Sequence, residues 1–148
     1  MRNPCFLAAL VTLPLGVLSA QEANTCKLIP RAEAAQILGK PQLATAKVVT
    51  DDSDCVYQNA GFLLRITEVN PAKWSAALQP LIKNKVAESV SGLGDEAVFT
   101  TDGPDSVLLM RKGTHELWLK LYHDWGGAPA QVKPTLTKLG KTAVAKLH

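Results

Sequence analysis

The chain has 148 residues, of which 47% are hydrophobic and 20% charged, and its formal net charge is +3 at pH 7. This length and composition predict one globular domain with its own core. The basic residues are spread along the chain rather than clustered, which argues against a nucleic-acid-binding surface. After the first twenty residues, no stretch is apolar over the roughly 18 to 20 residues that a membrane-spanning helix needs.

The first twenty residues have the pattern of a secretory signal peptide. Arg2 supplies a positive start, an apolar run follows over residues 6–18, and Ser19-Ala20 precede polar residues. We therefore expect residues 1–20 to be cleaved and residues 21–148 to form a single exported domain, periplasmic or secreted. The residues before Cys26 lack the small-residue pattern of a lipoprotein signal, so lipid attachment is not expected.

Two cysteines remain in the exported chain, because Cys5 lies in the signal peptide. In an oxidising compartment, the single pair Cys26 and Cys55 predicts a disulfide. A redox-active pair is the alternative, but such pairs usually have C-x-x-C spacing, which is absent here. We expect the bridge to contribute on the order of 3 to 4 kcal/mol to stability.

Signals for helix and strand alternate along the exported chain. Pro30 and Gly39 delimit a first helix, and Asn70-Pro71 begins a second, whose apolar residues recur at helical spacing until Pro80. Alternating apolar residues and short turns mark the strands. In chain order we predict a helix at 30–38, strands at 43–50, 55–58 and 61–69, a helix from 70 to about 79, strands at 96–101, 106–112 and 115–123, and a C-terminal helix.

The C-terminal helix has a continuous apolar stripe, with lysines on its other side. The stripe consists of Val132, Leu136, Leu139, Ala143 and Leu147. Short turns between the last three strands predict an antiparallel meander. Together the elements predict an α+β fold: a single antiparallel sheet of about five to six strands, with a short N-terminal helix, a middle helix and the C-terminal helix packed on it.

Residues 92–97, Gly-Leu-Gly-Asp-Glu-Ala, match the dinucleotide-binding fingerprint G-x-G-x-x-G/A. That fingerprint requires a buried strand before it and a helix after it, whereas here a polar segment precedes it and a β-leaning run follows. Its acidic side chains would also repel a pyrophosphate. We therefore interpret Gly92, Gly94 and Asp95 as a structural turn that leads into a strand. No nucleotide or other cofactor is expected.

Other chemical signals in the sequence are weaker. The acidic residues at 51–54 lack the glycine and glutamate of a calcium-binding EF-hand loop, so a solvated turn is favoured. His115 and His123 lie about 26 Å apart along one strand, too far to share a metal, and no metal site is expected. A hydrolase site would need a serine, a histidine and a carboxylate to converge in space. The serines available are Ser53, Ser75, Ser89, Ser91 and Ser106.

One surface is a candidate for binding. In residues 115–124, HELWLKLYHD, the leucines face the core, so the residues between them face the other side of the sheet. These residues either pack under a helix or lie on an open sheet face, which would suit a partner protein, an anionic glycan or a small envelope ligand. The candidate binding face consists of Trp118, Tyr122, Lys120, Arg65 and Arg111.

Several short motifs also occur in a characteristic order. They are Cys26-Lys27-Leu28-Ile29-Pro30, then Glu33-Ala34-Ala35 with Leu38-Gly39, then Cys55-Val56-Tyr57, and then residues 92–97. In this order they resemble a large group of small exported bacterial domains of unknown function, best known as actinobacterial lipoproteins. The resemblance covers most of the exported chain. It implies an antiparallel sheet with helices packed on it, a disulfide from the first helix region to an early strand, and a cell-envelope location, but no activity.

The sequence thus predicts an exported binding or scaffolding domain rather than an enzyme. The expected partner is an envelope protein, a glycan or a small ligand, and neither nucleic acid nor a membrane-spanning segment is expected. A secreted hydrolase with an unmarked active site, and an inhibitor of a secreted enzyme, are the alternatives.

Overall fold

The computed structural model describes residues 24–51, 53–59, 62–69, 78, 80, 83, 87–102, 105–122 and 129–148. The predicted signal peptide lies outside the described residues. So does most of the predicted middle helix, including Trp74.

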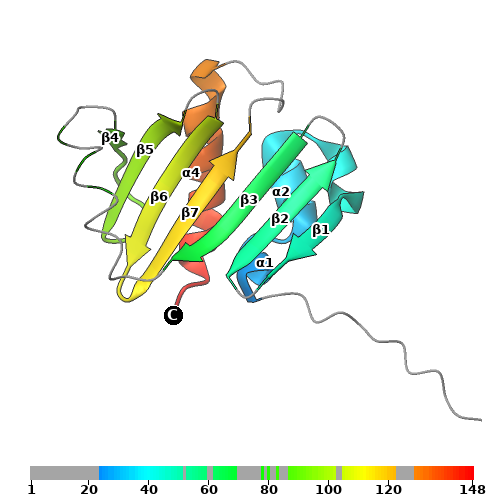
Figure 1. The fold of residues 1–148 in the computed structure, drawn as a ribbon, viewed down its shortest axis with the longest axis horizontal. Coiled ribbons are helices and arrows are strands. Elements are labelled where there is room, and N and C mark those ends of the chain that lie inside the picture. Colours follow the sequence, from blue (N-terminus) through cyan, green and yellow to red (C-terminus); the bar gives the residue numbers. More distant parts are fainter. Residues whose placement is uncertain are drawn as a thin grey trace, which may run out of the picture.

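The described residues form one seven-stranded antiparallel sheet (Figure 1). Its strands are β1 (Lys47–Thr50), β2 (Asp54–Asn59), β3 (Phe62–Val69), β4 (Ala87–Ser89), β5 (Glu96–Asp102), β6 (Asp105–Lys112) and β7 (His115–Leu121). Their order across the sheet is β1-β2-β3-β7-β6-β5-β4. Two local meanders, β1 to β3 and β4 to β7, are therefore joined by the pairing of β3 with β7, in which Leu64 lies opposite Leu121.

Three helices have described bounds, and all three lie on one side of the sheet, behind it in Figure 1. They are α1 (Asn24–Leu28), α2 (Arg31–Leu38) and α4 (Pro129–Ala145), and a 3-10 helix, η1 (Pro41–Thr45), precedes β1. Leu78, Pro80 and Lys83 are also helical, and Leu78 packs on the other side of the sheet. The α+β class and the single antiparallel sheet are confirmed, with seven strands instead of five to six. None of the described helices is both long and apolar enough to cross a membrane.

Several element boundaries differ from the sequence prediction in the described chain. α1 was not predicted, β7 ends at Leu121 instead of residue 123, and Pro80 and Lys83 are helical beyond the expected end of the middle helix near residue 79.

Two further differences have a clear physical reason. The strand predicted at 43–50 begins only at Lys47, because the preceding residues form η1 and Leu43 inserts fully buried into the core. The extra strand is β4, which was not predicted because two of its three residues, Glu88 and Ser89, are exposed and polar. Backbone pairing with β5, not apolar alternation, makes it a strand.

The main core lies between the helices and the sheet. All five residues of the predicted stripe are buried there, four of them on α4 and Leu147 just beyond its end, which confirms the helix and its orientation. At the C-terminal end of α4, Lys112 Nζ from β6 donates hydrogen bonds to the carbonyl oxygens of Val144, at 3.0 Å, and Leu147, at 2.8 Å. A cation at this end stabilises the helix and satisfies carbonyls that lack partners within it.

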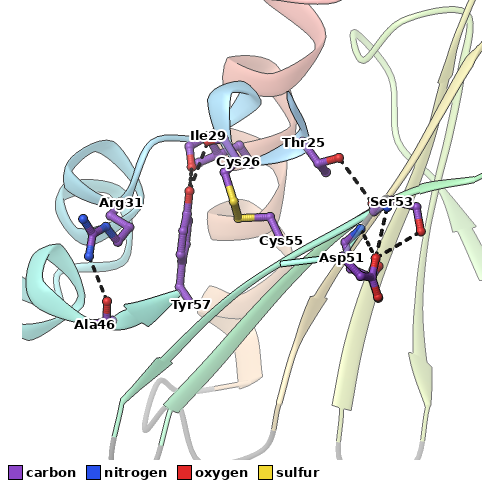
Figure 2. Close-up of a disulfide and its surroundings, with 10 residues drawn as sticks. Thr25, Cys26, Ile29, Arg31, Ala46, Asp51, Ser53, Cys55 and Tyr57 are labelled. Atoms are coloured by element: carbon purple, nitrogen blue, oxygen red, sulfur yellow. Dashed lines mark hydrogen bonds between the residues drawn. A yellow bond between two sulfur atoms is a disulfide. The ribbon is translucent and has the colours of Figure 1, made fainter. Parts of the chain in front are cut away.

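The predicted disulfide is present between Cys26 in α1 and Cys55 in β2, whose Cα atoms are 5.1 Å apart. Figure 2 shows that Tyr57 approaches the same junction from β2. Its hydroxyl lies 3.1 Å from the carbonyl oxygen of Cys26 and 2.6 Å from that of Ile29. One covalent bridge and one buried hydroxyl thus fix the segment between α1 and α2 to the sheet.

The glycine motif forms a turn that leads into β5, the arrangement that the structural interpretation expects. Gly92 and Gly94 have φ values of 77° and 64°. A Cβ atom on Gly94 would collide with the backbone oxygen of Arg111. Asp95 donates its backbone N–H to that same oxygen, at 2.8 Å, and its carboxylate accepts a hydrogen bond from the N–H of Gly113, at 2.7 Å. The motif therefore closes the ends of β5 and β6 against each other.

Candidate functional site

The five residues of the candidate binding face all lie on the side of the sheet opposite the helices, here called the outer face. Leu117, Leu119 and Leu121 belong to the helix-side core, so the alternate residues of β7 point to the outer face. In the strand register, Arg65 of β3 lies opposite Lys120 and Arg111 of β6 lies opposite Glu116. Both arginines therefore also project to the outer face. The charged residues and aromatic residues that the strand register places on the outer face include Asp54, Arg65, Glu96, Asp105, Arg111, Glu116, Trp118, Lys120 and Tyr122.

Arg65 and Asp54 form an ion pair on the β2–β3 part of the outer face. The Asp54 side chain is almost fully buried, whereas 43% of the Arg65 side chain is exposed. The hydrogen bond to Asp54 raises the pKa of Arg65 above its ordinary value, with a smaller contribution from Tyr122. The guanidinium therefore remains charged at any physiological pH and presents part of its surface to solvent.

Lys120 is the cation next to Arg65 across the β3–β7 pairing. Its Nζ lies 3.2 Å from a carboxylate oxygen of Asp105 and 5.0 Å from the centre of the Tyr122 ring. The second distance is within the range of a cation–π contact. The two contacts hold the ammonium group against the sheet, with 24% of the side chain exposed.

Arg111 lies between two carboxylates in a row that crosses β5, β6 and β7. Its guanidinium is 3.5 Å from a carboxylate oxygen of Glu96, and its opposite neighbour on β7 is Glu116. Glu116 is only 1% exposed. Burial raises the pKa of Glu116 above its ordinary value, and the charge of Arg111 opposes this shift only in part.

Trp118 is half-buried and packs against a small second core on the outer face. Leu78, Val98, Val107 and Leu109 form that core, with Leu78 only 2% exposed. The sequence left two arrangements open for Trp118, either packed or on an open sheet face. In the structure its ring is packed. Its indole Nε1 is nevertheless buried without a hydrogen-bond partner.

Buried polar atoms without a hydrogen-bond partner concentrate on the outer face. Among the described residues there are five such side-chain atoms: Asp54 Oδ1, Arg65 Nε, Arg111 Nε, Glu116 Oε2 and Trp118 Nε1. Every one belongs to the outer face, and none belongs to the helix-side core. Native proteins rarely leave such atoms unsatisfied unless water, an ion or a ligand supplies the partner. Three are donors and two are acceptors, so a suitable ligand offers both kinds of group.

The outer face is mixed in charge. Each predicted cation has a carboxylate: Asp54 for Arg65, Asp105 for Lys120 and Glu96 for Arg111. Sequence reasoning missed Asp54 and Asp105 as site residues because both lie at strand ends, in segments that look like solvated turns. Only the strand register shows that they project to the same side as the cations.

Two further observations bear on chemistry. No cluster of three or more histidine, cysteine, aspartate or glutamate side chains that could hold a metal ion occurs in the described part of the chain. His115 Nδ1 lies 3.2 Å from Glu68 Oε1, in a contact that is more than one-third exposed on both sides.

Comparisons with protein-family models, curated proteins and solved structures found no match to this chain.

Proposed function

We propose that this protein is an exported, non-catalytic binding domain that recognises a protein partner through the outer face of its sheet. The observation that carries the proposal is the concentration of unsatisfied buried polar atoms on that face, two of which, Asp54 Oδ1 and Arg65 Nε, lie on its β2–β3 part. Buried donors and acceptors without partners cost free energy in the isolated protein. A ligand or an ordered water layer that satisfies them recovers that cost on binding.

The balance of charge favours a protein partner over an anionic glycan. Three ion pairs neutralise Arg65, Lys120 and Arg111, so the face does not present the uncompensated positive charge that a polyanion requires. Arginine and aromatic residues, by contrast, are enriched in protein–protein interfaces. Tyr122 and Arg65 are both half-buried, and they are the side chains best placed to make contact.

The accessible part of the outer face lies over β1, β2 and β3. On the other half, Leu78 packs on Val98, Val107 and Leu109. On the β1–β3 half, Gln58 and Val49 are exposed and Val56 is half-buried. We therefore place the centre of the interface near Arg65, with Tyr122 on one side and Val56 on the other.

The proposal is tested by capture from the native envelope fraction with structure-based variants. Tyr122→Ala removes an aromatic contact, and Gln58→Arg adds bulk at an exposed position of β2. Lys138→Ala, an exposed residue of α4 on the other side of the sheet, is the matched control. We expect the same partner to be captured by the native chain and the control and to be lost with both face variants.

Equal capture by all four proteins would contradict the proposed face. Capture of a polysaccharide that persists after protease treatment of the extract would replace the protein partner with a glycan. Turnover of a substrate from a hydrolase panel by the native chain, abolished by one Ser→Ala change, would replace binding with catalysis.

A further inference from the structure

β1 is an edge strand that the described residues leave open on its outer side. It is last in the sheet order and pairs only with β2 among the described strands. Lys47, Val49 and Thr50 are exposed, and Figure 1 shows β1 at the border of the sheet. The outward backbone N–H and C=O groups of such a strand form a template for pairing with another strand.

The side chain at the middle of this edge is apolar. Val49 is 43% exposed, and it is the one exposed large hydrophobic residue in the described part of the chain. It projects to the outer face, because it lies opposite Val56, which in turn lies opposite Arg65. Edge strands that resist pairing usually place charge, proline or a bulge at such positions. β1 has a β-branched apolar residue at this position, with Lys47 and Asp51 two residues away on either side.

The charges that flank Val49 are complementary under two-fold symmetry. Lys47 precedes Val49 by two residues and Asp51 follows it by two. Asp51 continues the β1–β2 pairing by one residue, since its N–H donates to the carbonyl oxygen of Asp54 at 3.2 Å. Side chains two apart on a strand share a face. Lys47, Val49 and Asp51 therefore form a row of cation, apolar residue and anion along the edge.

A second copy of the same strand matches this row in one register. Two copies related by an axis perpendicular to the sheet pair antiparallel, and the residue on the axis lies opposite itself. With Val49 on the axis, the two valines are in contact and each Lys47 lies opposite Asp51 of the second copy. With Val48 on the axis, Lys47 lies opposite Val49 instead, and both charges lose their partners.

The carboxylate of Asp51 is held by hydrogen bonds and is ionised, as an ion pair with a lysine requires. Its Oδ1 accepts hydrogen bonds from the backbone N–H groups of Ser53, at 3.0 Å, and Asp54, at 2.8 Å. These bonds, with a smaller contribution from Arg65, lower the pKa of Asp51, so the group is ionised at neutral pH. Both bonds use Oδ1, so neither of them occupies Oδ2.

We propose that two copies of the chain associate antiparallel through β1, centred on Val49, with Lys47 of each copy paired to Asp51 of the other. The result is one continuous sheet of two seven-stranded halves. The contact involves only residues 47–51 of each copy, so it buries less than the roughly 1,200 Å² of a standard stable interface. The dimer is therefore weak and reversible, with a dissociation constant of about 10 μM or weaker.

This dimer goes beyond the proposed binding function and does not depend on it. It would also place two copies of the proposed binding surface side by side, because the β1–β3 halves of both outer faces become neighbours in one surface. A partner with two matching sites would then bind with an avidity that neither copy has alone. Dimerisation itself is measured without any partner present.

Sedimentation equilibrium of the purified exported protein, over about 1 to 500 μM, tests the charge pairing. Lys47→Glu places two carboxylates opposite each other and is expected to weaken the dimer about tenfold or more. Adding Asp51→Asn to Lys47→Glu removes that repulsion, so the double variant dimerises more tightly than the Lys47→Glu single variant. Asparagine keeps the Oδ1 acceptor of the turn. Lys138→Glu on α4 is the control and leaves the dissociation constant unchanged.

A second measurement tests the register. In Val49→Cys the two thiols lie opposite each other, and mild oxidation is expected to give a covalent dimer between them. Gln58→Cys, an exposed position one strand further in, is the matched control and stays monomeric on a reducing-agent-free gel. A native chain that is monomeric throughout the range, a double variant no tighter than Lys47→Glu alone, or equal cross-linking at 49 and 58 would each overturn the proposal.

Discussion

Tyr57 shows how one hydroxyl group fixes two helices to a sheet. The side chain is 1% exposed, and its hydroxyl is within hydrogen-bond distance of the carbonyl oxygens of Cys26 and Ile29. The hydroxyl has one proton, which the two carbonyl oxygens share. Tyr57→Phe leaves the ring in place but removes this donor from both buried carbonyls. We expect the free energy of unfolding to fall by about 1 to 3 kcal/mol, measured by chemical denaturation.

Tyr122→Phe is the matched control, because Tyr122 is the other tyrosine of the chain and is only half-buried. Solvent can satisfy the groups that its hydroxyl leaves, so the expected loss is smaller than for Tyr57→Phe. Equal losses from the two variants would mean that the Tyr57 hydroxyl does not hold the α1–α2 junction.

Glu116 makes stability depend on pH through burial. Its pKa is raised above the ordinary 4.5, first by desolvation, so the native state holds this proton at pH values where the unfolded chain has lost it. The carboxyl therefore opposes folding progressively as pH rises from about 4.5 through the raised pKa, and below that window it has no such effect. Glu116→Gln is expected to be more stable than the native chain at pH 8, by about 1 kcal/mol, and equal to it near pH 4.

Unfolding midpoints at both pH values check the sign of this effect. Glu96→Gln serves as the control. It removes a carboxylate that also pairs with Arg111, but the Glu96 side chain is 40% exposed. It is expected to lower stability slightly at pH 8, as surface ion pairs contribute about 0 to 1 kcal/mol. A Glu116→Gln variant that is less stable than the native chain at pH 8 would show that the ionised form is the one folding requires.

At the scale of elements, Gly140 sets how closely α4 approaches the sheet. A Cβ atom at this position would lie 2.6 Å from Met110 Sδ and 2.9 Å from Leu108 Cδ2. Alanine is intrinsically better than glycine in a helix by about 1 kcal/mol, but overpacking a core costs about 1 to 3 kcal/mol. We expect Gly140→Ala to lower the free energy of unfolding, because the collision outweighs the gain in helix propensity.

A double-variant cycle assigns that loss to the contact with Met110. Met110→Val shortens the side chain nearest to the added methyl group, so its combination with Gly140→Ala should cost less than the sum of the two single changes. Additive losses would place the strain elsewhere along α4.

The disulfide connects α1 to β2 where hydrophobic burial alone would have to hold a helix of five residues. Cys26 is 1% and Cys55 0% exposed, so the bridge is shielded from reductants in the folded protein. Replacing both cysteines with alanine is expected to cost about 2 to 5 kcal/mol. The native, unreduced protein should show no reactive thiol from this pair, and labelling of both would contradict the bridge.

The elements that could be predicted from the sequence are those with a clear apolar pattern of their own. The stripe on α4 and the alternation in β5, β6 and β7 both reflect burial against the main core, and both were predicted correctly. In contrast, α1 is too short to show a periodic pattern. β4 is a strand because it pairs with β5, and no property of residues 87–89 alone indicates that pairing.

At the scale of the whole molecule, the pairing of β3 with β7 assembles the candidate site. The sequence predicted that Trp118, Lys120 and Tyr122 share a face, because alternation within one strand fixes that relation. It did not predict the carboxylates that neutralise the face. Asp54 and Asp105 come from the starts of β2 and β6, and only the strand order, which no local pattern contains, brings them beside Arg65 and Lys120.

The same topology predicts a gradient of amide hydrogen exchange across the sheet. β3 and β7 join the two meanders at the centre, and opening them requires the sheet to separate, so their amides should exchange only through global unfolding. β1 and β4 lie at the two edges and should exchange through local opening. If β1 pairs with a second copy, its protection rises with protein concentration, whereas that of β4 does not change. Fast exchange in β3 or β7, measured residue by residue in dilute protein, would mean that the two meanders are separate folding units.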